Sequence, residues 1–563
     1  MREYDPLGLR TEEKLVPVQA AYKHREALRQ VPGSRWDPFQ RAWLVPVTKG
    51  AAAALRCIPG VPLPPELAAL APPPTEMTDA ISGDEAPVAP MPIKAKPYAH
   101  QVAAYNAALG HYRAWQGGFA LFHEQGCGKT LTAIALMGRL ALDGRIQRAL
   151  VVAPLAVLPV WEKDMAAYAS YPYALRIVHG AAKAKAKAWL DLTEGPGGLL
   201  KVMVINYDGL RSGENMTRIA AFAPDMVILD EGQRIKNHQS RQAKAAHAIG
   251  AAARYRLLLT GTPVGNSPLD LWSQYKFLDP AIFERSFYAF RAHYAVMGGY
   301  GGYEIIRYQH LDELTEKAHA IAHRVTKAQA LDLPERIDQT LYCQLEPAAL
   351  RAYRQMQRDK VAELAEGKAT APQIVTQMMR LSQITGGFLQ ADGGGALTRV
   401  SRAKLALLRE TLEDLLAAGE KVVIFARFRA EIADILALCL ELGGPGSTRS
   451  IWGEVASKDY GQAVEDFQTD PQARLFAAQI QAAGAGITLH AAHTAIFYSL
   501  DYSYLNYDQA KARIHRIGQR QPCTYLHLVA KDTIDETVLA ALAAKKNIAE
   551  DIVDNWRRVF AAP

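Results

Sequence analysis

The chain has 563 residues, of which 49% are hydrophobic and 21% charged, as in folded globular proteins. Its five cysteines form no Cys-x-x-Cys pair, so the sequence predicts neither a zinc site nor a disulfide scaffold. No apolar stretch reaches the roughly 18 residues of a membrane span, and the first residues lack the apolar core of a signal peptide. The length allows three or four domains, and the formal net charge of +7 is unevenly distributed along them.

The first 60 residues are basic and contain clustered aromatic side chains. They hold ten Lys and Arg against six Asp and Glu, a net charge of +4. The run VPGSRWDPFQRAWLVPV, residues 31–47, sets tryptophans among arginines, a combination that suits a junction between duplex and single-stranded nucleic acid. Residues 1–60 are therefore predicted to form a small β-rich DNA-binding module, in which at least one tryptophan belongs to the core. The candidate DNA contacts are Arg35, Trp36, Arg41 and Trp43.

A proline-rich segment follows the basic module. Residues 61–97 contain ten of the 31 prolines, and residues 61–100 carry two Lys or Arg against five Asp or Glu. Proline has no backbone N–H to donate and its φ is fixed, so a segment this rich in proline is predicted to be a semi-rigid linker. We therefore expect residues 61–96 to tether the module to the rest of the chain.

The segment EQGCGKT, residues 124–130, has the composition of a phosphate-binding loop. Glycines allow backbone N–H groups to turn toward phosphates, Lys129 can reach the β- and γ-phosphates, and the Thr130 hydroxyl can ligate Mg²⁺. An apolar run at residues 118–122 and a helix-like run after the loop predict the strand–loop–helix context that such a loop needs. The first glycine of the general pattern is replaced by His123.

Two adjacent carboxylates follow a second apolar run. Residues 226–229 predict a buried strand, and Asp230 and Glu231 come directly after it. In parallel α/β sheets, ligands bind at the carboxyl ends of the strands, where this pair would lie. Asp230 is expected to hold Mg²⁺, and Glu231 is expected to orient or deprotonate an attacking water.

A basic segment near the C-terminus, QAKARIHRIGQR at residues 509–520, supplies two arginines. Arg513 and Arg516 are three residues apart, so a helix here would place them on one face together with Gln509. A guanidinium at the γ-phosphate stabilises the charge of the transition state. Because these arginines are nearly four hundred residues from the phosphate-binding loop, we expect them to reach it from a second lobe.

Short apolar runs alternate with helix-length segments in two parts of the chain, a pattern typical of parallel α/β sheets. Residues 97–278 and 403–563 are each predicted to form such a lobe. Residues 279–402 lack this rhythm and are predicted to be a mainly helical protrusion and linker region. The runs expected to be strands are 118–122, 150–153, 202–206, 226–229, 257–260, 421–425, 449–452, 475–479 and 495–500.

Taken in order, these segments resemble the Swi/Snf-like DNA-dependent ATPases of helicase superfamily two, from about residue 97 to residue 554. The resemblance includes KPYAHQ ending at Gln101, LLLTGTPVGN from Leu257, VVIFARF from Val422, QIQAAGAGITLHAAHTAIF from Gln479 and HRIGQ from His515. It implies two RecA-like lobes with helical insertions, ATP and Mg²⁺ as cofactors, and duplex or forked DNA as the partner. The N-terminal run resembles the HARP domain that accompanies annealing helicases of the family.

The resemblance also assigns roles to residues that chemistry alone does not single out. Gln101 corresponds to the family's adenine-reading glutamine, and Thr262 and Thr488 correspond to positions that contact DNA. The implied ATP-binding residues are Gln101, Gln125, Gly126, Cys127, Gly128, Lys129, Thr130, Gly486 and Gln509, and the implied catalytic residues are Lys129, Asp230, Glu231, Arg513 and Arg516.

Two departures from the family pattern bear on function. Gly232 and Gln233 stand where the family has Ala-His after the acidic pair, and glutamine cannot gain a proton as histidine can. Tyr502, Ser503 and Tyr504 replace a Trp-Asn-Pro signature. The sequence therefore predicts that coupling between hydrolysis and movement on DNA is tuned differently here.

The sequence thus predicts an ATP-dependent DNA translocase that acts on forked or partly single-stranded DNA and reanneals or remodels strands. A strand-separating helicase, on DNA or on DNA–RNA hybrids, is the first alternative, with a short hairpin between residues 290 and 310 as its wedge. A non-catalytic, ATP-sensing DNA-binding scaffold is an alternative of another class, and chromatin remodelling is a third. The small size and Ala-rich composition favour a cytoplasmic, nucleoid-associated protein of a bacterium or a phage-infected cell.

Overall fold

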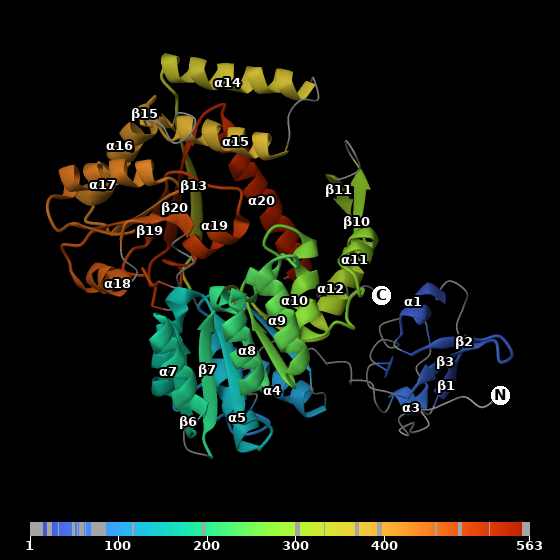
Figure 1. Ribbon diagram of the computed structural model, residues 1–563. Helices are drawn as coiled ribbons and strands as arrows, with labels where there is room; N and C mark the ends of the chain where they lie inside the picture. Colours follow the sequence, from blue (N-terminus) through green and yellow to red (C-terminus); the bar gives the residue numbers. More distant parts are fainter. Residues whose placement is uncertain are drawn as a thin grey trace.

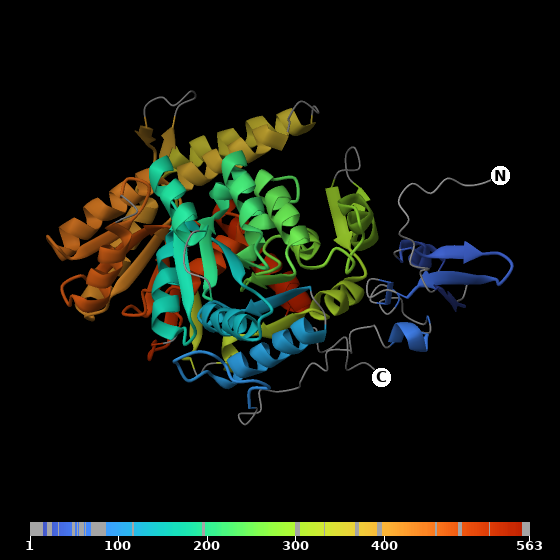
Figure 2. The ribbon, with the colours of Figure 1, turned by 60° about the horizontal axis from the view of Figure 1, so that its bottom comes forward.

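The computed structural model describes most of the chain between Leu15 and Val553. It shows a small N-terminal module and two larger α/β lobes packed against each other (Figures 1 and 2). The described residues are 15–19, 25–31, 33–47, 51–52, 55, 61, 64–68, 86–114, 117–193, 198–298, 304–330, 333–365, 371–390, 397–455, 459–481, 487–516 and 518–553.

The first lobe is built on a seven-stranded sheet in which every neighbouring pair of strands is parallel. The strands are β4 (Gly118–His123), β5 (Arg148–Ala153), β6 (Tyr173–Val178), β7 (Leu200–Asn206), β8 (Met226–Asp230), β9 (Tyr255–Leu259) and β12 (Ala322–Val325). Their order across the sheet is β12-β4-β9-β8-β5-β7-β6. Every residue of β4 and β8 is buried, as expected for central strands of a parallel sheet covered on both faces.

Helices connect these strands and extend the first lobe. They are α4 (Ala99–Ala114), α5 (Lys129–Leu142), α6 (Leu158–Tyr168), α7 (Ala182–Thr193), α8 (Gly213–Phe222), α9 (Arg241–Ala252), α10 (Leu271–Leu278), α11 (Phe287–Tyr294) and α12 (Leu311–His319). Between α11 and α12, strands β10 (Ala295–Gly298) and β11 (Glu304–Tyr308) pair antiparallel. The hairpin expected between residues 290 and 310 is therefore present, and its tip at residues 299–303 lies outside the described residues.

The second lobe repeats the parallel arrangement with six strands. They are β13 (Arg336–Cys343), β16 (Val422–Ala426), β17 (Thr448–Ile451), β18 (Leu475–Gln479), β19 (Thr494–Phe497) and β20 (Cys523–Ala530), in the order β13-β20-β19-β16-β18-β17. The helices are α16 (Ala403–Ala417), α17 (Arg429–Gly443), α18 (Tyr460–Thr469), α19 (Tyr504–Lys511) and α20 (Ile534–Val553). Helix α20 also packs against α12, so the last described helix contacts the first lobe.

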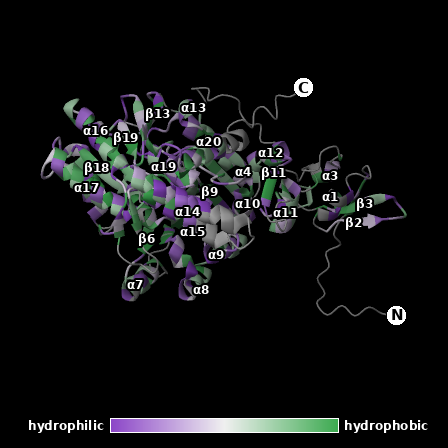
Figure 3. Cartoon of the chain, turned by 90° about the horizontal axis from the view of Figure 1, so that it is seen from above, coloured by the Kyte–Doolittle hydropathy of each residue, from purple (hydrophilic) through white to green (hydrophobic). Residues whose placement is uncertain are grey.

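The cores of the two lobes follow from strand periodicity. Alternate residues of β16 contribute to separate hydrophobic clusters on the two faces of the second sheet: Val423 and Phe425 to one, Val422 and Ile424 to the other. In Figure 3, hydrophobic residues gather in strands such as β18 and β19, and hydrophilic residues line helices such as α14 (Pro347–Ala365). None of the helices in the described part of the chain is long and apolar enough to cross a membrane.

The segment between the lobes differs from the predicted, mainly helical region at residues 279–402. It includes α14 and α15 (Ala371–Thr385), which project from the second lobe (Figure 1), and a short hairpin of β14 (Phe388–Gln390) and β15 (Leu397–Arg399). It also gives β12 to the first sheet and β13 to the second, each as an edge strand. Because β13 is largely exposed, it lacks the apolar run that marks a central strand. The chain thus crosses between the sheets at residues 326–335.

The N-terminal module is a three-stranded antiparallel sheet, as the predicted β-rich module requires. Strand β3 (Ala42–Pro46) lies between β1 (Leu15–Val18) and β2 (Arg35–Asp37), and the short helices α1 (Arg25–Gln30) and α3 (Pro65–Ala68) accompany the sheet. The module has its own small core, separate from those of the lobes.

Both ends of the predicted linker at residues 61–96 belong to folded parts. Leu67, on α3, is fully buried in the core of the module. At the other end, the Val88 backbone N–H donates to Asn106 Oδ1 on α4 at 2.8 Å, and Ile93 forms an isolated bridge with Ala169. The linker is shorter than predicted. Proline is compatible with the first turn of a helix, as in α3, and with extended chain packed against a lobe, so a high proline content does not exclude folded ends. The residues left as tether, 69–85, lie outside the described part of the chain.

Candidate functional site

The loop between β4 and α5, residues 124–128, has the backbone of an anion-binding turn. Gly126 and Gly128 have φ of 91° and 71°, in the left-handed region that glycine adopts without strain. A side chain at Gly128 would also clash with the Gln101 amide. The loop leads directly into α5, whose N-terminus starts at Lys129. Free N–H groups and the positive end of the helix dipole favour a phosphate at this position.

Lys129 and Gln101 are held against this loop. Lys129 Nζ donates to the carbonyl oxygens of His123, at 2.9 Å, and Glu124, at 3.3 Å. Gln101, which is 2% exposed, accepts from the Tyr98 backbone N–H at 2.9 Å and lies 3.4 Å from the Gly128 oxygen through its Nε2. The predicted adenine-reading residue is therefore packed on the phosphate-binding loop.

Asp230 and Glu231 lie at the carboxyl end of β8, on the same edge of the sheet as the 124–128 loop. Asp230 Oδ2 accepts a 2.9 Å hydrogen bond from Trp161 Nε1, and Tyr207 donates its hydroxyl to the Asp230 backbone oxygen at 2.8 Å. Burial, and then the neighbouring charge of Glu231, raise the pKa of Asp230 to about 6. A buried carboxylate with a raised pKa is the kind of group that gains most from a cation.

The second lobe reaches this edge through α19 and the turn after it. Gln509 Nε2 on α19 lies 3.5 Å from Glu231 Oε2. Arg516 packs over the phosphate-binding loop, with its Cβ 3.6 Å from where a Cβ on Gly126 would be. Arg513 and Arg516 both donate to the Ile487 oxygen, at 3.4 and 3.1 Å. The three segments singled out from the sequence therefore meet between the lobes.

One local detail differs from expectation. Arg513 and Arg516 were predicted to share a helix face with Gln509, but α19 ends at Lys511 and both arginines lie in the irregular turn that follows. The turn still aligns them, because both guanidinium groups converge on the Ile487 oxygen. Burial, and then Arg516, lower the pKa of Arg513 to about 10, so Arg513 stays charged at neutral pH.

Several polar atoms around the site are buried with no hydrogen-bond partner among the described residues. They include both amide atoms of Gln125, Oε1 of Gln233 and Nε of Arg513. Such atoms are costly unless a ligand or ordered water satisfies them. Together with the glycine cradle and the carboxylate pair, they fit a polyanionic ligand with a bound cation.

Cys127 and Thr130, two further predicted ATP-binding residues, lie in the loop and at the start of α5. The Cys127 thiol is buried, and burial raises its pKa to about 11, so it is a packed thiol rather than a reactive one. The Thr130 side chain is half-buried in the first turn of α5. Gly486 lies outside the described residues.

The predicted DNA contacts fall into two groups. Thr262 is 8% exposed, and Thr488 is half-buried in irregular chain before Leu489. Gly261, the residue before Thr262, packs against the phosphate-binding loop.

In the N-terminal module, the two tryptophans have different environments. Trp43 is 6% exposed and belongs to the core of the module, whereas Trp36 is 50% exposed and meets Trp43 edge-to-face at 5.8 Å between ring centroids. Arg35 and Arg41 are exposed on the same hairpin. Phe39, an aromatic of the same run that was not among the predicted DNA contacts, is 97% exposed at the hairpin tip. The sequence alone does not show which of the three aromatics of this run are core and which are exposed.

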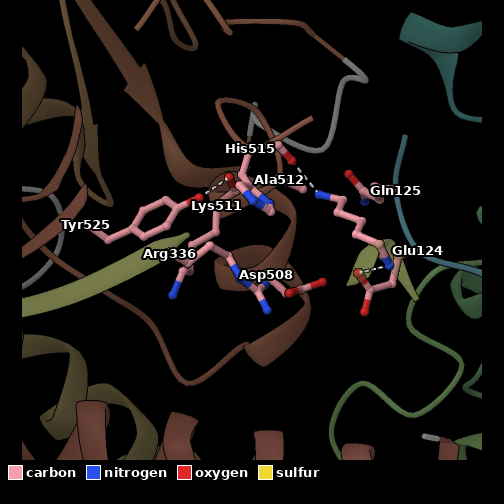
Figure 4. Close-up of a pocket in the computed structure, with 9 residues that line it drawn as sticks. Glu124, Gln125, Arg336, Asp508, Lys511, Ala512, His515 and Tyr525 are labelled. Atoms are coloured by element: carbon pink, nitrogen blue, oxygen red, sulfur yellow. Dashed lines mark hydrogen bonds between the residues drawn. The ribbon is translucent and has the colours of Figure 1, made fainter. Parts of the chain in front are cut away.

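Several residues between the lobes, Lys327 among them, were not predicted. A polar pocket there is lined by Glu124, Gln125, Lys327, Arg336, Asp508, Lys511, Ala512, His515 and Tyr525. Figure 4 shows Glu124 and Gln125 from the first lobe facing Asp508 and His515 from the second. The residues around Lys327 form no recognisable motif, so only the fold shows that Lys327 lies beside the site.

Comparison with known proteins places the chain in a family. A model described as "SNF2-related domain" matches residues 98–386, and one described as "Helicase conserved C-terminal domain" matches residues 403–518. Similar relatives include "Chromodomain-helicase-DNA-binding protein 1-like" of Danio rerio, 26% identical over 78% of this chain and 42% of the relative. In Arabidopsis thaliana, "Protein CHROMATIN REMODELING 4" is 27% identical over 81% of this chain and 21% of the relative. "Probable ATP-dependent DNA helicase CHR12" is 27% identical over 77% and 40%.

The chain spans less than half the length of these relatives. Among solved structures, the "Sulfolobus solfataricus SWI2/SNF2 ATPase core in complex with dsDNA" is similar, at 24% identity and a TM-score of 0.40, over 85% of this chain and 97% of that one.

The expected setting, a cytoplasmic protein of a bacterium or a phage-infected cell, is contradicted by these relatives. They come from a fish and a plant, and two of their names refer to a chromodomain helicase and to chromatin remodelling. Small size and Ala-rich composition describe how a chain folds, and they carry no information about the cell that holds it.

The two matched domains follow each other in the order of the two lobes, and the first alone covers more than half of the chain. The chain belongs to the SWI2/SNF2 family of ATPases in helicase superfamily two.

Proposed function

We propose that this protein is a DNA-dependent ATPase that moves along DNA and acts on forked or partly single-stranded substrates, where it reanneals or remodels strands. The observation that carries the proposal is the meeting of the lobes: Gln509 approaches Glu231, and Arg516 packs over the phosphate-binding loop. A site completed by two lobes can couple ATP hydrolysis to their relative movement. Relatives named as DNA helicases support DNA as the partner.

Within the first lobe, each residue has a role in binding ATP. The backbone of residues 125–128 would surround the phosphates, Lys129 would leave its loop carbonyls to contact the β- and γ-phosphates, and Gln101 would read adenine. The unpartnered amide of Gln125 is available to the same ligand. Glu231 would orient the attacking water and take its proton, with Gln233 holding the carboxylate through a 2.6 Å hydrogen bond.

Mg²⁺ fits the donors present. Asp230 and the Thr130 hydroxyl would hold it, since both are oxygen ligands at the nucleotide edge of the sheet. The cation, when bound, neutralises charge that develops on the transferred phosphate. Asp230 is already oriented by Trp161 Nε1, so its free lone pairs point in a fixed direction.

The second lobe supplies positive charge. Arg513 and Arg516 share the Ile487 oxygen as acceptor, and a γ-phosphate would compete for their remaining N–H groups. Gln509 would contact the nucleotide or Glu231 from the same side. Because these groups come from the lobe opposite the phosphate-binding loop, their distance to the phosphate depends on lobe closure.

The preference for forked DNA rests on the N-terminal module, which we infer to be HARP-like. Trp36 and Phe39 are exposed on the β2–β3 hairpin with Arg35 and Arg41 beside them. Exposed rings can stack on unpaired bases while arginines contact phosphates. Trp43 supports the hairpin from within the core and is no longer a candidate contact. Thr262 and Thr488 remain candidate contacts of the motor lobes with DNA.

One observation favours a second candidate, strand separation. The β10–β11 hairpin projects from the first lobe, and Ile306 on β11 is 66% exposed. An apolar side chain on a projecting hairpin can insert between base pairs. The strands of this hairpin are short, four residues in β10 and five in β11, so annealing or remodelling is the preferred activity.

The test compares ATP turnover with duplex, single-stranded, forked and RNA effectors, and strand reannealing with strand release on one labelled fork. We expect DNA to stimulate turnover, forked DNA to stimulate it most, and ATP to accelerate reannealing. ATP-dependent release of the labelled strand would favour the helicase alternative. ATP binding with no turnover under any effector would identify a scaffold and contradict the proposal.

A further inference from the structure

Lys327 lies where the chain leaves the first lobe. It contacts residues from both halves of the proposed nucleotide site. It begins the short helix α13 (Lys327–Ala330), directly after β12 and before the chain enters β13 of the second lobe. It is 6% exposed. A lysine this deeply buried needs partners for its charge, and its partners define what it does.

The backbone of Lys327 is tied to the first lobe. Its N–H donates to Glu124 Oε2 at 3.1 Å. The other oxygen of Glu124 pairs with Arg324 at 3.4 Å, and Arg324 donates to the Phe122 oxygen on β4 at 2.9 Å. Glu124 is the first residue of the 124–128 loop, so the start of α13 is fixed relative to that loop.

The side chain of Lys327 is tied to the second lobe. Nζ donates a 2.6 Å hydrogen bond to the backbone oxygen of His515, the residue immediately before Arg516. Figure 4 shows His515 and Glu124 at opposite ends of this connection, each with its dashed hydrogen bond. One residue therefore joins the phosphate-binding loop to the segment that carries the arginines.

A second hydrogen bond holds the same segment from the crossing chain. His515 Nε2 lies 2.9 Å from the Pro334 oxygen. Burial lowers the pKa of His515 to about 4, so the ring is neutral and donates through Nε2–H. With its carbonyl held by Lys327 and its ring by Pro334, His515 has little freedom to rotate, and Arg516 follows it.

Lys327 remains protonated at neutral pH and can donate its hydrogen bond. Burial lowers its pKa to about 8, while Asp508 and then Glu124 oppose the shift. Asp508, on α19, lines the same pocket. The Lys327 charge is thus balanced by one carboxylate from each lobe. The hydrogen bond to the His515 oxygen orients the Lys327 side chain.

We propose that Lys327 is a positioning residue for the arginine pair: it fixes the segment of Arg513 and Arg516 relative to the phosphate-binding loop, so that its loss slows ATP hydrolysis without weakening ATP binding. This inference rests on the proposed ATPase activity. The proposed function gives Lys327 no contact with nucleotide or DNA. Lys327 acts only through its hydrogen bond to His515.

The test uses the full-length chain and three substitutions. Lys327→Met keeps the aliphatic length but removes the donor, Lys327→Arg keeps donor and charge, and Lys531→Ala, at an exposed lysine, is the control. We expect Lys327→Met to lower the DNA-stimulated kcat by about 10-fold or more, since a charge-assisted hydrogen bond is among the stronger ones. The KM for ATP and binding of a non-hydrolysable ATP analogue should change less than about 2-fold, with Lys327→Arg regaining most of kcat.

A double-mutant cycle separates positioning from general destabilisation. In a background with both Arg513→Ala and Arg516→Ala, Lys327→Met should have little further effect on the residual rate, because both groups that it positions are already gone. An equal loss in both backgrounds would overturn the proposal, as would unchanged kcat, a raised KM with normal kcat, or a Lys327→Met chain that does not fold. If the unmodified chain lacks DNA-stimulated turnover, the proposed ATPase function fails instead, which the wild-type measurement shows separately.

Discussion

The side-chain amide of Gln233 donates a 2.6 Å hydrogen bond to Glu231 Oε2, the same oxygen that lies 3.5 Å from Gln509 Nε2 of the second lobe. Glu231 itself has a left-handed backbone, with φ of 53°. The carboxylate is thus oriented by one amide from each lobe. Gln233, where the family usually has histidine, fixes the proposed base without the option of gaining a proton.

Removal of this amide should slow chemistry more than binding. We expect Gln233→Ala to lower DNA-stimulated kcat between about 10- and 100-fold, because a displaced base loses its attack geometry. The KM for ATP should change little. Steady-state kinetics check this, with Gln242→Ala as the control, since Gln242 bonds an exposed carboxylate, Asp208, away from the site. Normal kcat in Gln233→Ala would mean that Glu231 is held by other groups.

Lys129→Ala and Glu231→Gln should both abolish turnover but differ in binding. Lys129 would contact the phosphates, so its loss should weaken ATP binding as well as turnover, whereas Glu231→Gln should still capture ATP. Loss of one such group commonly costs on the order of 10²-fold or more in rate. Turnover and equilibrium ATP binding are to be measured for both, beside Lys163→Ala at an exposed lysine of α6. Near-normal turnover in either variant would contradict the catalytic assignment.

Glu431, at the start of α17, gives a pH-dependent prediction for the second lobe. Its carboxyl is fully buried and accepts from the backbone N–H groups of Arg427 and Phe428, at 3.2 and 3.1 Å. Burial raises its pKa from 4.5 to about 7. The folded state therefore holds this proton more tightly than the unfolded state, and stability contributed by the neutral form is lost as pH rises from about 4.5 through 7.

Glu431→Gln keeps an acceptor but cannot ionise, so it should remove this loss. We expect the variant to gain thermal stability over the unmodified chain at pH 8, on the order of 1 kcal/mol or more, and to gain little at pH 5. Thermal unfolding at both pH values checks this, with Glu465→Gln on the surface as control. An equal difference at pH 5 and pH 8 would show that ionisation of Glu431 is not responsible.

The N-terminal module should set substrate preference without being needed for hydrolysis. Residues from Ala86 onward pack on the first lobe: Asn106 Nδ2 donates to the Ala86 oxygen at 3.1 Å, and Tyr105 donates to the Pro90 oxygen at 3.2 Å. A chain beginning at Glu85 should therefore remain an ATPase but lose its preference for forked DNA. The slope of log K against log salt should fall by roughly 0.9 for each DNA phosphate that the shortened chain no longer neutralises.

A substitution separates stacking from charge in the same module. Trp36→Ala with Phe39→Ala should reduce fork preference while leaving the salt slope unchanged, because the arginines remain. Titrations on forked and blunt DNA at several salt concentrations measure both quantities. Identical fork preference in the double variant would mean that these exposed rings do not stack on bases.

The sequence predicted the central parts of the fold because buried parallel strands have continuous apolar runs. β4, β8, β16 and β18 were found within a residue or two of their bounds. The edge strands β12 and β13 were not predicted, since half-exposed edges alternate or carry charge. The central strand β20 was also missed although it is buried, because Thr524 and His527 interrupt its apolar run. The predicted linker, residues 61–96, was too long, because proline content does not show which folded part each end packs against.

The site was predictable where one short segment holds the chemistry. Glu124 to Thr130 and the Asp230–Glu231 pair have spacings that chemistry dictates. Trp161, which orients Asp230, and Lys327, which joins the lobes, depend on hydrogen bonds across 69 and 188 residues of sequence, respectively, and carry no local signal. Residues that contact the site from distant parts of the sequence can therefore be identified only from the fold.

The central claim, that two lobes complete one ATPase site on DNA, is tested most directly by Arg516→Ala in saturating duplex DNA. Arg520→Ala, at an exposed arginine of the same segment, is the control. We predict that Arg516→Ala binds ATP almost as tightly as the unmodified chain but loses about 10³-fold or more of the DNA-stimulated rate, as arginine fingers do, while Arg520→Ala keeps it. Arg513→Ala should behave like Arg516→Ala, less severely. DNA-stimulated turnover as fast in Arg516→Ala and Arg513→Ala as in the unmodified chain would contradict the two-lobed site.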